Sequence, residues 1–149
     1  MLRLSRLTDY AVVVLVRLNA VQGVATSPVI AASVGIPEPT VAKVLKALAG
    51  QGLVTSIRGA HGGYRLGRPL NEIAISEVIV AVDGPIALTS CVDGAVGCDS
   101  LALCPMAGRW DPVNDAVRNA LANTSLADMA AAVRRAPRPP VTASFNEVA

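Results

Sequence analysis

The chain has 149 residues, a length typical of one small domain with an added assembly element, and 52% of them are hydrophobic. Only 3% are aromatic, so we expect an aliphatic core. The net charge of +2 hides an asymmetry, because residues 1–75 carry eight Lys/Arg against three Asp/Glu, whereas residues 76–149 carry five against eight. The basic first half indicates a polyanionic partner for that half, although ordinary surface charge gives the same excess.

The apolar run near the N-terminus does not have the features of an export signal. It spans residues 10–16, Asp9 and Arg17 flank it closely, and no small-residue cleavage site follows it. No uncharged apolar stretch reaches the ~18 residues that a membrane span needs. We therefore expect a cytoplasmic protein with no membrane partner. In that compartment, clustered cysteines more often bind metal or act in redox chemistry than form lasting disulfides.

Three helices are predicted in the first fifty residues. The first spans residues 5–21, and the second is a short helix over residues 27–35, with Ser27 as its cap and Gly35 at its end. The third opens near Pro39 and has an apolar stripe at helical spacing, formed by Val41, Val44, Leu45 and Leu48. A short helix, a glycine-containing turn and an amphipathic helix make a helix-turn-helix pattern.

The outward face of this third helix is basic. With the apolar stripe buried, the helix presents Thr40, Lys43 and Lys46 to solvent. Two lysines one turn apart, with small residues between them, fit a phosphate-lined major groove. Many helical hairpins also carry lysines on their solvent face, so the next segment matters for the interpretation.

A basic β-hairpin follows the third helix. Residues 53–57 and 64–66 are β-prone, and they flank a glycine-rich turn. Arg58 in this turn can enter a minor groove or contact phosphate, and Arg65 adds charge on the second segment. His61, the only histidine, lies in the same turn; we favour a surface or DNA-facing role for it over metal ligation.

The second half of the chain is predicted to be helical around one irregular loop. A short helix with Ser76 as its cap covers residues 76–82, and a late helix runs from about Trp110 to Asn123. The late helix has an apolar face and an alanine-rich second face, as a dimerisation element would, formed by Trp110, Val113, Val117 and Leu121 and by Ala116 and Ala120. Residues 125–133 add a last helical piece, and residues 134–149 read as a disordered tail with three prolines.

The irregular loop holds every cysteine of the chain, Cys91, Cys98 and Cys104, within fourteen residues. Grouped thiolates are soft ligands for zinc, copper or iron–sulfur chemistry, and a proline directly after the last cysteine occurs in some iron–sulfur loops. Three cysteines leave one ligand missing from the usual four. Zinc binding, a redox disulfide from Cys91 to Cys98 or Cys104, and three unrelated cysteines remain alternatives.

Nothing in the sequence indicates an enzyme. The Gly59–Gly63 turn has no helix directly after it, so it is not a dinucleotide-binding loop, and the chain has no recognisable Ser/His/Asp set and only one histidine. An iron–sulfur carrier is the non-regulatory alternative that remains.

Together these features resemble the Rrf-type winged-helix regulators represented by IscR, NsrR and RirA, above all their SUF-operon iron–sulfur assembly regulators. The likeness lies in residues 1–11, 52–66 and 82–86 and in the cysteine loop, and it covers roughly residues 1–133. It implies a homodimeric transcription factor that reads iron–sulfur status through a bound cluster. In that family the late helix crosses to the partner, and the third helix and wing read a partly palindromic site in double-stranded DNA.

The resemblance also assigns residues. Cys91, Cys98 and Cys104 fall on the family's cluster cysteines, Arg58 falls on the wing arginine that enters the minor groove, and Thr40 and Lys43 fall on the recognition-helix surface. IscR-like members place a histidine three residues after the last cysteine, where this chain has Ala107. NsrR-like members use an aspartate in the partner's first helix, and Asp9 matches it. This resemblance favours a [4Fe–4S] cluster over [2Fe–2S], with Asp9 as fourth ligand.

We therefore predict a mainly α fold with a small β-wing. A winged helix-turn-helix DNA-binding domain covers residues 1–82, a cysteine cluster-binding loop 83–107, a long dimerisation helix with an end segment 108–134, and a disordered tail 135–149. The predicted function is an iron–sulfur-sensing repressor of iron–sulfur assembly or iron-homeostasis genes. The alternatives are a DNA-binding redox or zinc sensor and an iron–sulfur carrier.

Overall fold

The computed structural model describes residues 3–94, 98–100 and 102–132. The predicted disordered tail lies outside the described residues, as does part of the cysteine loop. The elements, in chain order, are α1 (Arg6–Asn19), α2 (Ser27–Val34), α3 (Glu38–Gly50), β1 (Val54–Ile57), β2 (Gly63–Leu66), η1 (Leu70–Glu72), α4 (Ile75–Asp83), η2 (Val92–Gly94), α5 (Asp111–Ala122) and α6 (Leu126–Ala132). The mainly helical fold with one small antiparallel sheet agrees with the prediction.

The elements from α1 to α4 form what we call the head, which is built on an aliphatic core. α1 packs against α2, α3 and α4, and the apolar stripe predicted for α3 is buried. The largest fully buried side chains are aliphatic, among them Leu15, Ile30, Leu45, Leu48, Leu53 and Ile73. Burial of these side chains, at about 25 cal/mol per Å² of apolar surface, is the main force that holds the head together.

Two predicted helix caps are wrong, both by one or two residues. Thr26 rather than Ser27 occupies the N-cap of α2, and the Ser27 hydroxyl instead donates a hydrogen bond to Glu38 on α3. Ser76 does not cap α4, because Glu77 does so by accepting a 2.9 Å hydrogen bond from the Ala74 N–H. The Glu77 bond satisfies a backbone group at the start of α4, whereas Thr26 makes no side-chain hydrogen bond at the start of α2.

The predicted wing is present. β1 and β2 pair antiparallel from Val54 opposite Leu66 to Ile57 opposite Gly63. Tyr64 also exchanges two backbone hydrogen bonds, of 2.8 and 2.9 Å, with Ala25, which precedes α2. This bridge ties the wing to the helix-turn-helix.

The chain leaves the head after α4 and returns through α5. α5 contacts α4 and η2, and α6 then packs back on the head beside α1 and η1. Two backbone hydrogen bonds of 2.9 Å secure the return, from Leu126 N–H to the Ile73 carbonyl and from Ile75 N–H to the Thr124 carbonyl. Leu126 is fully buried in the head's core. The late helix has 12 residues, and its role in dimerisation remains a prediction.

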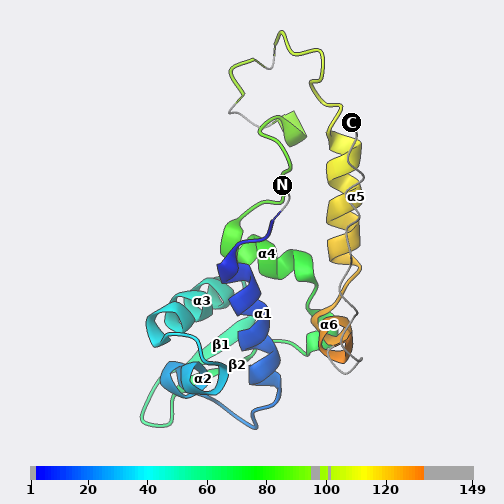
Figure 1. Cartoon of the computed structure of the whole chain (residues 1–149). Coiled ribbons are helices and arrows are strands. Elements are labelled where there is room, and N and C mark those ends of the chain that lie inside the picture. Colours follow the sequence, from blue (N-terminus) through cyan, green and yellow to red (C-terminus); the bar gives the residue numbers. More distant parts are fainter. Residues whose placement is uncertain (1–2, 95–97, 101, 133–149) are drawn as a thin grey trace, which may run out of the picture.

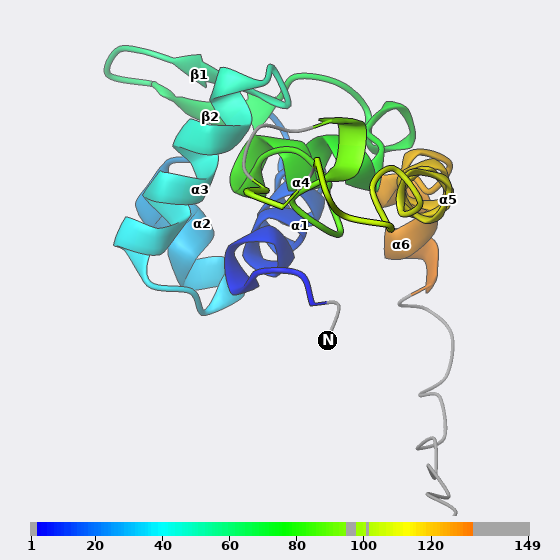
Figure 2. The same cartoon turned by 90° about the horizontal axis from the view of Figure 1, so that it is seen from above.

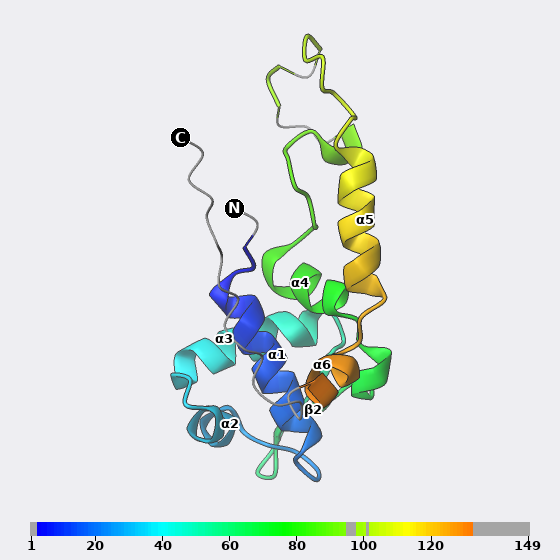
Figure 3. The ribbon, with the colours of Figure 1, turned by 45° about the vertical axis from the view of Figure 1, so that its right-hand side comes forward.

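The molecule is elongated along α5. In Figures 1 and 3 the cysteine loop lies at one end, above α5, whereas the wing hairpin lies at the other end, below α2 and α3. Figure 2, which views α5 nearly end-on, shows the wing projecting past α3, away from α5 and α6. None of the described helices is long and apolar enough to span a bilayer.

Candidate cysteine site and nucleic-acid interface

The three cysteines lie in the irregular segment between α4 and α5. Each thiol is free and half-buried. The Cys91 sulfur lies 3.2 Å from the Thr89 hydroxyl oxygen, a hydrogen-bonding distance for sulfur. Within the part of the chain that the structure describes, no three Cys, His, Asp or Glu side chains are close enough together to hold a metal ion. The structure thus brings the thiols to one end of the molecule but does not gather them around one point.

The segment leading to Cys91, residues 86–93, is held against α5 by side chains that sequence reasoning missed; we call this segment the loop stem. Asn114 of α5 accepts a 2.9 Å hydrogen bond from the Leu88 N–H and donates a 3.2 Å bond to the Ile86 carbonyl. Arg118, one turn later, donates a 3.0 Å bond to the same carbonyl. Asn114 is fully buried, which is unusual for its residue type and follows from these contacts.

The C-terminal end of the loop stem is held to α5 by an ion pair and a hydrogen bond. Arg118 forms an ion pair with Asp93, and the Asp93 N–H donates a 3.3 Å hydrogen bond to Asp111 at the start of α5. The hydrogen bond from Arg118, with the attraction of its charge, lowers the pKa of Asp93 below its usual range. Asp93 has a left-handed backbone with φ 59°, so the chain turns sharply just after Cys91.

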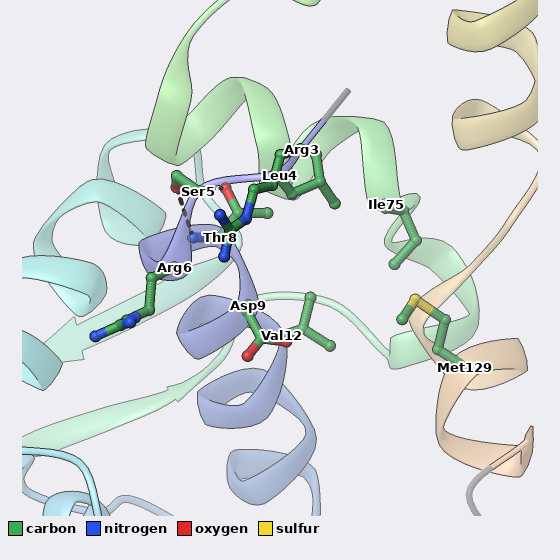
Figure 4. Close-up of a pocket in the computed structure, with 9 residues that line it drawn as sticks. All are labelled: Arg3, Leu4, Ser5, Arg6, Thr8, Asp9, Val12, Ile75 and Met129. Atoms are coloured by element: carbon green, nitrogen blue, oxygen red, sulfur yellow. Dashed lines mark hydrogen bonds between the residues drawn. The ribbon is translucent and has the colours of Figure 1, made fainter. Parts of the chain in front are cut away.

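Asp9, the predicted fourth ligand, lies exposed in the first turn of α1. It lines an open pocket of about 620 Å³, and Figure 4 shows it on the same side of α1 as Val12, with Met129 of α6 and Ile75 of α4 across the pocket. The described cysteines do not line this pocket, and among the described residues Asp9 is not part of any group of three potential metal ligands.

Thr8, beside Asp9, links α1 to the base of the loop stem. Its hydroxyl donates a 2.7 Å hydrogen bond to Asp83, the last residue of α4, and its backbone N–H donates to the Ser5 hydroxyl at 3.1 Å. Thr8 is 1% exposed, one of the few buried polar residues described. The start of α1 and the end of α4 are therefore fixed to each other where the chain leaves the head.

The predicted DNA-binding residues lie on two surfaces of the head. Lys43 and Lys46 are exposed on α3, and Thr40 on the same helix is half-buried. The wing carries the other predicted contacts, all exposed: Arg58, His61 and Arg65. Among the described residues none of these basic side chains forms an ion pair, whereas Arg68 is engaged with Glu77 at 2.6 Å. The unpaired cations on α3 and the wing suit contact with phosphates.

The wing turn has no room for a side chain at Gly62. A Cβ on Gly62 would lie 2.4 Å from the Ile57 carbonyl oxygen and 2.9 Å from that of Gly59, distances that folded chains do not tolerate. Gly62 instead donates a 3.0 Å backbone hydrogen bond to Gly59, which closes the turn. The basic tip therefore has a fixed, narrow shape that can approach a nucleic-acid backbone closely.

Comparison with known proteins identifies the family. Residues 4–132 match the Rrf2 family, described as "Iron-dependent Transcriptional regulator". The HTH-type transcriptional regulator IscR of Photorhabdus laumondii is 32% identical over 130 residues, which are 86% of this chain and 79% of that protein. The structure of CymR, the global cysteine regulator of B. subtilis, is similar with a TM-score of 0.66 at 28% identity, covering 88% of this chain and 98% of that chain. IscR of T. potens has a TM-score of 0.64 at 25% identity, covering 92% and 94%. This chain is therefore a DNA-binding transcriptional regulator of the Rrf2 family, and not an enzyme.

Proposed function

We propose that this regulator is a homodimer that holds an iron–sulfur cluster at its cysteine loop, and that the state of the cluster sets its affinity for a partly palindromic operator. The observation that carries the proposal is the grouping of all three cysteines in one loop at the end of α5 away from the wing. The family's description as iron-dependent supports iron as the metal. We expect a cytoplasmic repressor of iron–sulfur assembly or iron-homeostasis genes.

The cysteine side chains are chemically suited to bind an iron–sulfur cluster. Cys91, Cys98 and Cys104 are free and half-buried, and thiolates are the usual ligands of iron–sulfur clusters. Asp9 of the partner subunit is the proposed fourth ligand, and three thiolates with one oxygen favour [4Fe–4S] over [2Fe–2S]. A bound cluster would supply a group that reacts with oxidants or nitric oxide.

The proposed dimer rests on α5. Trp110 at the N-cap of this helix and Val113 within it are 41% and 47% exposed, although both side chains are apolar. Apolar side chains lined up on one helix and left exposed in a single chain mark an interface. Sedimentation analysis of Val113→Glu should show a shift from dimer to monomer. Asn119→Glu, an exposed polar position on the same helix, is the matched control, and an unchanged dimer in Val113→Glu would remove α5 from the interface.

A chain of direct contacts is available to carry the signal. The loop stem is bonded to α5, α5 contacts α4, and Asp83 at the end of α4 bonds to Thr8 on α1, which packs against α3. A change at the cysteines that moves the stem therefore acts on the elements that carry the recognition helix. We propose that this shifts the angle between the two wings of the dimer, and so its fit to the operator.

The first experiment is a visible spectrum of protein purified without oxygen, with iron and sulfide counted per chain. Broad absorbance near ~400 nm with about four irons per chain supports the [4Fe–4S] proposal. About two irons and a structured spectrum indicate [2Fe–2S] and a different fourth ligand. Colourless protein that carries zinc, or that takes up no iron on reconstitution, contradicts the cluster.

The DNA side needs its own measurement. Fluorescence anisotropy with fragments from upstream of the protein's own gene, comparing cluster-loaded and metal-free protein, should give two affinities for one fragment. Equal affinities would remove the cluster as the switch. Failure of both forms to bind any such fragment would favour the carrier alternative.

A second candidate is a DNA-binding sensor that uses its thiols without a cluster. It is favoured by the likeness to CymR, the global cysteine regulator of B. subtilis, and by cysteines that are not gathered around one point in the described residues. In this reading, oxidation of Cys91 with Cys98 or Cys104 changes DNA affinity in metal-free protein. Zinc uptake without colour would indicate a related sensor.

A further inference from the structure

We infer that Asn114 and Arg118 are positioning residues that place Cys91 and lock the cysteine loop to α5. The inference rests on the proposed role of the cysteines and deepens it, because it predicts that one of the three cysteines is held in place more firmly than the other two. Cys91 is held in a fixed stem, whereas Cys98 and Cys104 follow in the segment beyond it.

The Asn114 side chain supplies hydrogen-bond partners for the backbone of the loop stem. Its Oδ1 accepts a hydrogen bond from the Leu88 N–H at 2.9 Å, and its Nδ2 donates one to the Ile86 carbonyl at 3.2 Å. Asparagine is a poor residue for a helix interior, and it is fully buried here. Its contribution is therefore to the stem, since without it the Leu88 N–H loses its partner and the Ile86 carbonyl keeps only its bond from Arg118.

Arg118 joins the two ends of the stem. Its Nε donates to the Ile86 carbonyl at 3.0 Å, and its terminal nitrogen pairs with the carboxylate of Asp93. Between these two anchors, Val92 is 1% exposed and its N–H reaches the Thr89 carbonyl at 3.4 Å. Cys91 lies between these two anchors, so the position of its backbone depends on both of them.

The arrangement predicts an asymmetry among the thiols that can be measured without any metal. Cys91 is half-buried in the closed stem, opening of the stem exposes it further, and a more exposed thiol reacts faster with an alkylating reagent. Loss of Asn114 or Arg118 should therefore speed the reaction of Cys91 and leave the other two cysteines largely unaffected.

The test uses the full-length, reduced, metal-free protein. Samples are treated with iodoacetamide for increasing times and quenched, and the modified fraction of each cysteine is followed by mass spectrometry. Asn114→Ala is the main variant. Arg118→Lys, which keeps the charge but cannot span both anchors, decides the question if Asn114→Ala does not fold by circular dichroism. Asn119→Ala, an exposed residue on the same helix, is the matched control.

We expect the rate at Cys91 to rise on the order of tenfold in either variant, with Cys98 and Cys104 within about a factor of two of the unsubstituted protein. An unchanged Cys91, or an equal rise at all three cysteines, would overturn the inference, because neither fits a local anchor. The same variants, loaded with iron and sulfide, should lose visible absorbance in air faster than Asn119→Ala. If the unsubstituted protein takes up no cluster, the proposed function fails, while the alkylation pattern still decides the role of Asn114 and Arg118.

Discussion

A buried threonine next to the proposed ligand Asp9 ties α1 of the head to the end of α4, where the chain leaves for the cysteine loop. Thr8 donates its hydroxyl to Asp83 at 2.7 Å, and it does so from a position that is 1% exposed. A position as buried as this one is usually occupied by an apolar side chain that packs in the core. The hydroxyl instead fixes the end of α4 against α1, where the chain turns into the loop stem.

Replacement of Thr8 by valine keeps the shape and removes the hydroxyl. Because a partly buried hydrogen bond to a carboxylate is lost, we expect the free energy of unfolding to fall by about 1–2 kcal/mol in urea titrations of the metal-free protein. Asp83→Ala should cost a similar amount, and the double variant less than the sum of the two. Additive losses would show that Thr8 and Asp83 do not interact. Thr55→Val, on the exposed strand β1, is the control.

At the scale of an element, the shape of the wing depends on the close packing of Gly62 against the backbone of the turn. A methyl group on Gly62 would lie 2.4 Å from the Ile57 carbonyl oxygen, so Gly62→Ala must move the turn that carries Arg58 and His61. We expect operator affinity, measured by anisotropy, to fall on the order of tenfold or more, since base and phosphate contacts depend on placement. Gly50→Ala at the end of α3 is the control, because a methyl there meets nothing within 4 Å. Unchanged affinity in Gly62→Ala would mean that the wing tip does not touch DNA.

The start of α4 is pH-sensitive through Glu77. Burial alone would raise the pKa of Glu77, but hydrogen bonds from the Ala74 N–H and from Arg68, with the charge of Arg68, lower it below its ordinary value of 4.5. A lowered folded-state pKa adds stability that is present above the unfolded pKa and is lost as the pH falls through the folded one.

The matching prediction compares Glu77→Gln with the unsubstituted protein. Glutamine keeps the cap and removes the charge, and the pair is more than a third exposed, so we expect a difference of only about 0.5–1 kcal/mol at pH 7 after solvent screening. The difference should shrink toward zero as the pH falls below 4.5, where the glutamate also becomes neutral. Urea titrations at pH 7 and at lower pH measure it. Glu72→Gln, an exposed residue of η1, is the control, and a difference that did not change with pH would contradict the assignment.

At the scale of the whole molecule, local patterns could be predicted from the sequence and long-range polar contacts could not. The apolar stripe of α3 and the β-prone segments around the wing turn are properties of neighbouring residues, and the structure has both elements. The caps of α2 and α4 differ from the prediction because several adjacent residues can serve, and packing selects among them. The hydrogen bonds of Asn114 to the loop stem join residues that are 26 and 28 positions apart in the sequence, and a local sequence pattern cannot predict such contacts. An asparagine within an otherwise amphipathic helix was the one available signal.

The charge asymmetry of the chain leads to a prediction about the whole regulator on DNA. Each Lys or Arg that contacts phosphate displaces a counterion, so the logarithm of the binding constant falls linearly with the logarithm of the salt concentration. Arg58→Ala should weaken operator binding and, with one wing from each subunit of a dimer, should reduce the slope of that line by about 2. Arg109→Ala is the matched control, because Arg109 is also exposed but belongs to the segment that leads into α5 and not to the wing. A slope that fell equally in both variants would show that general positive charge, rather than the wing, holds the DNA, and the operator would then have to be read by α3 alone.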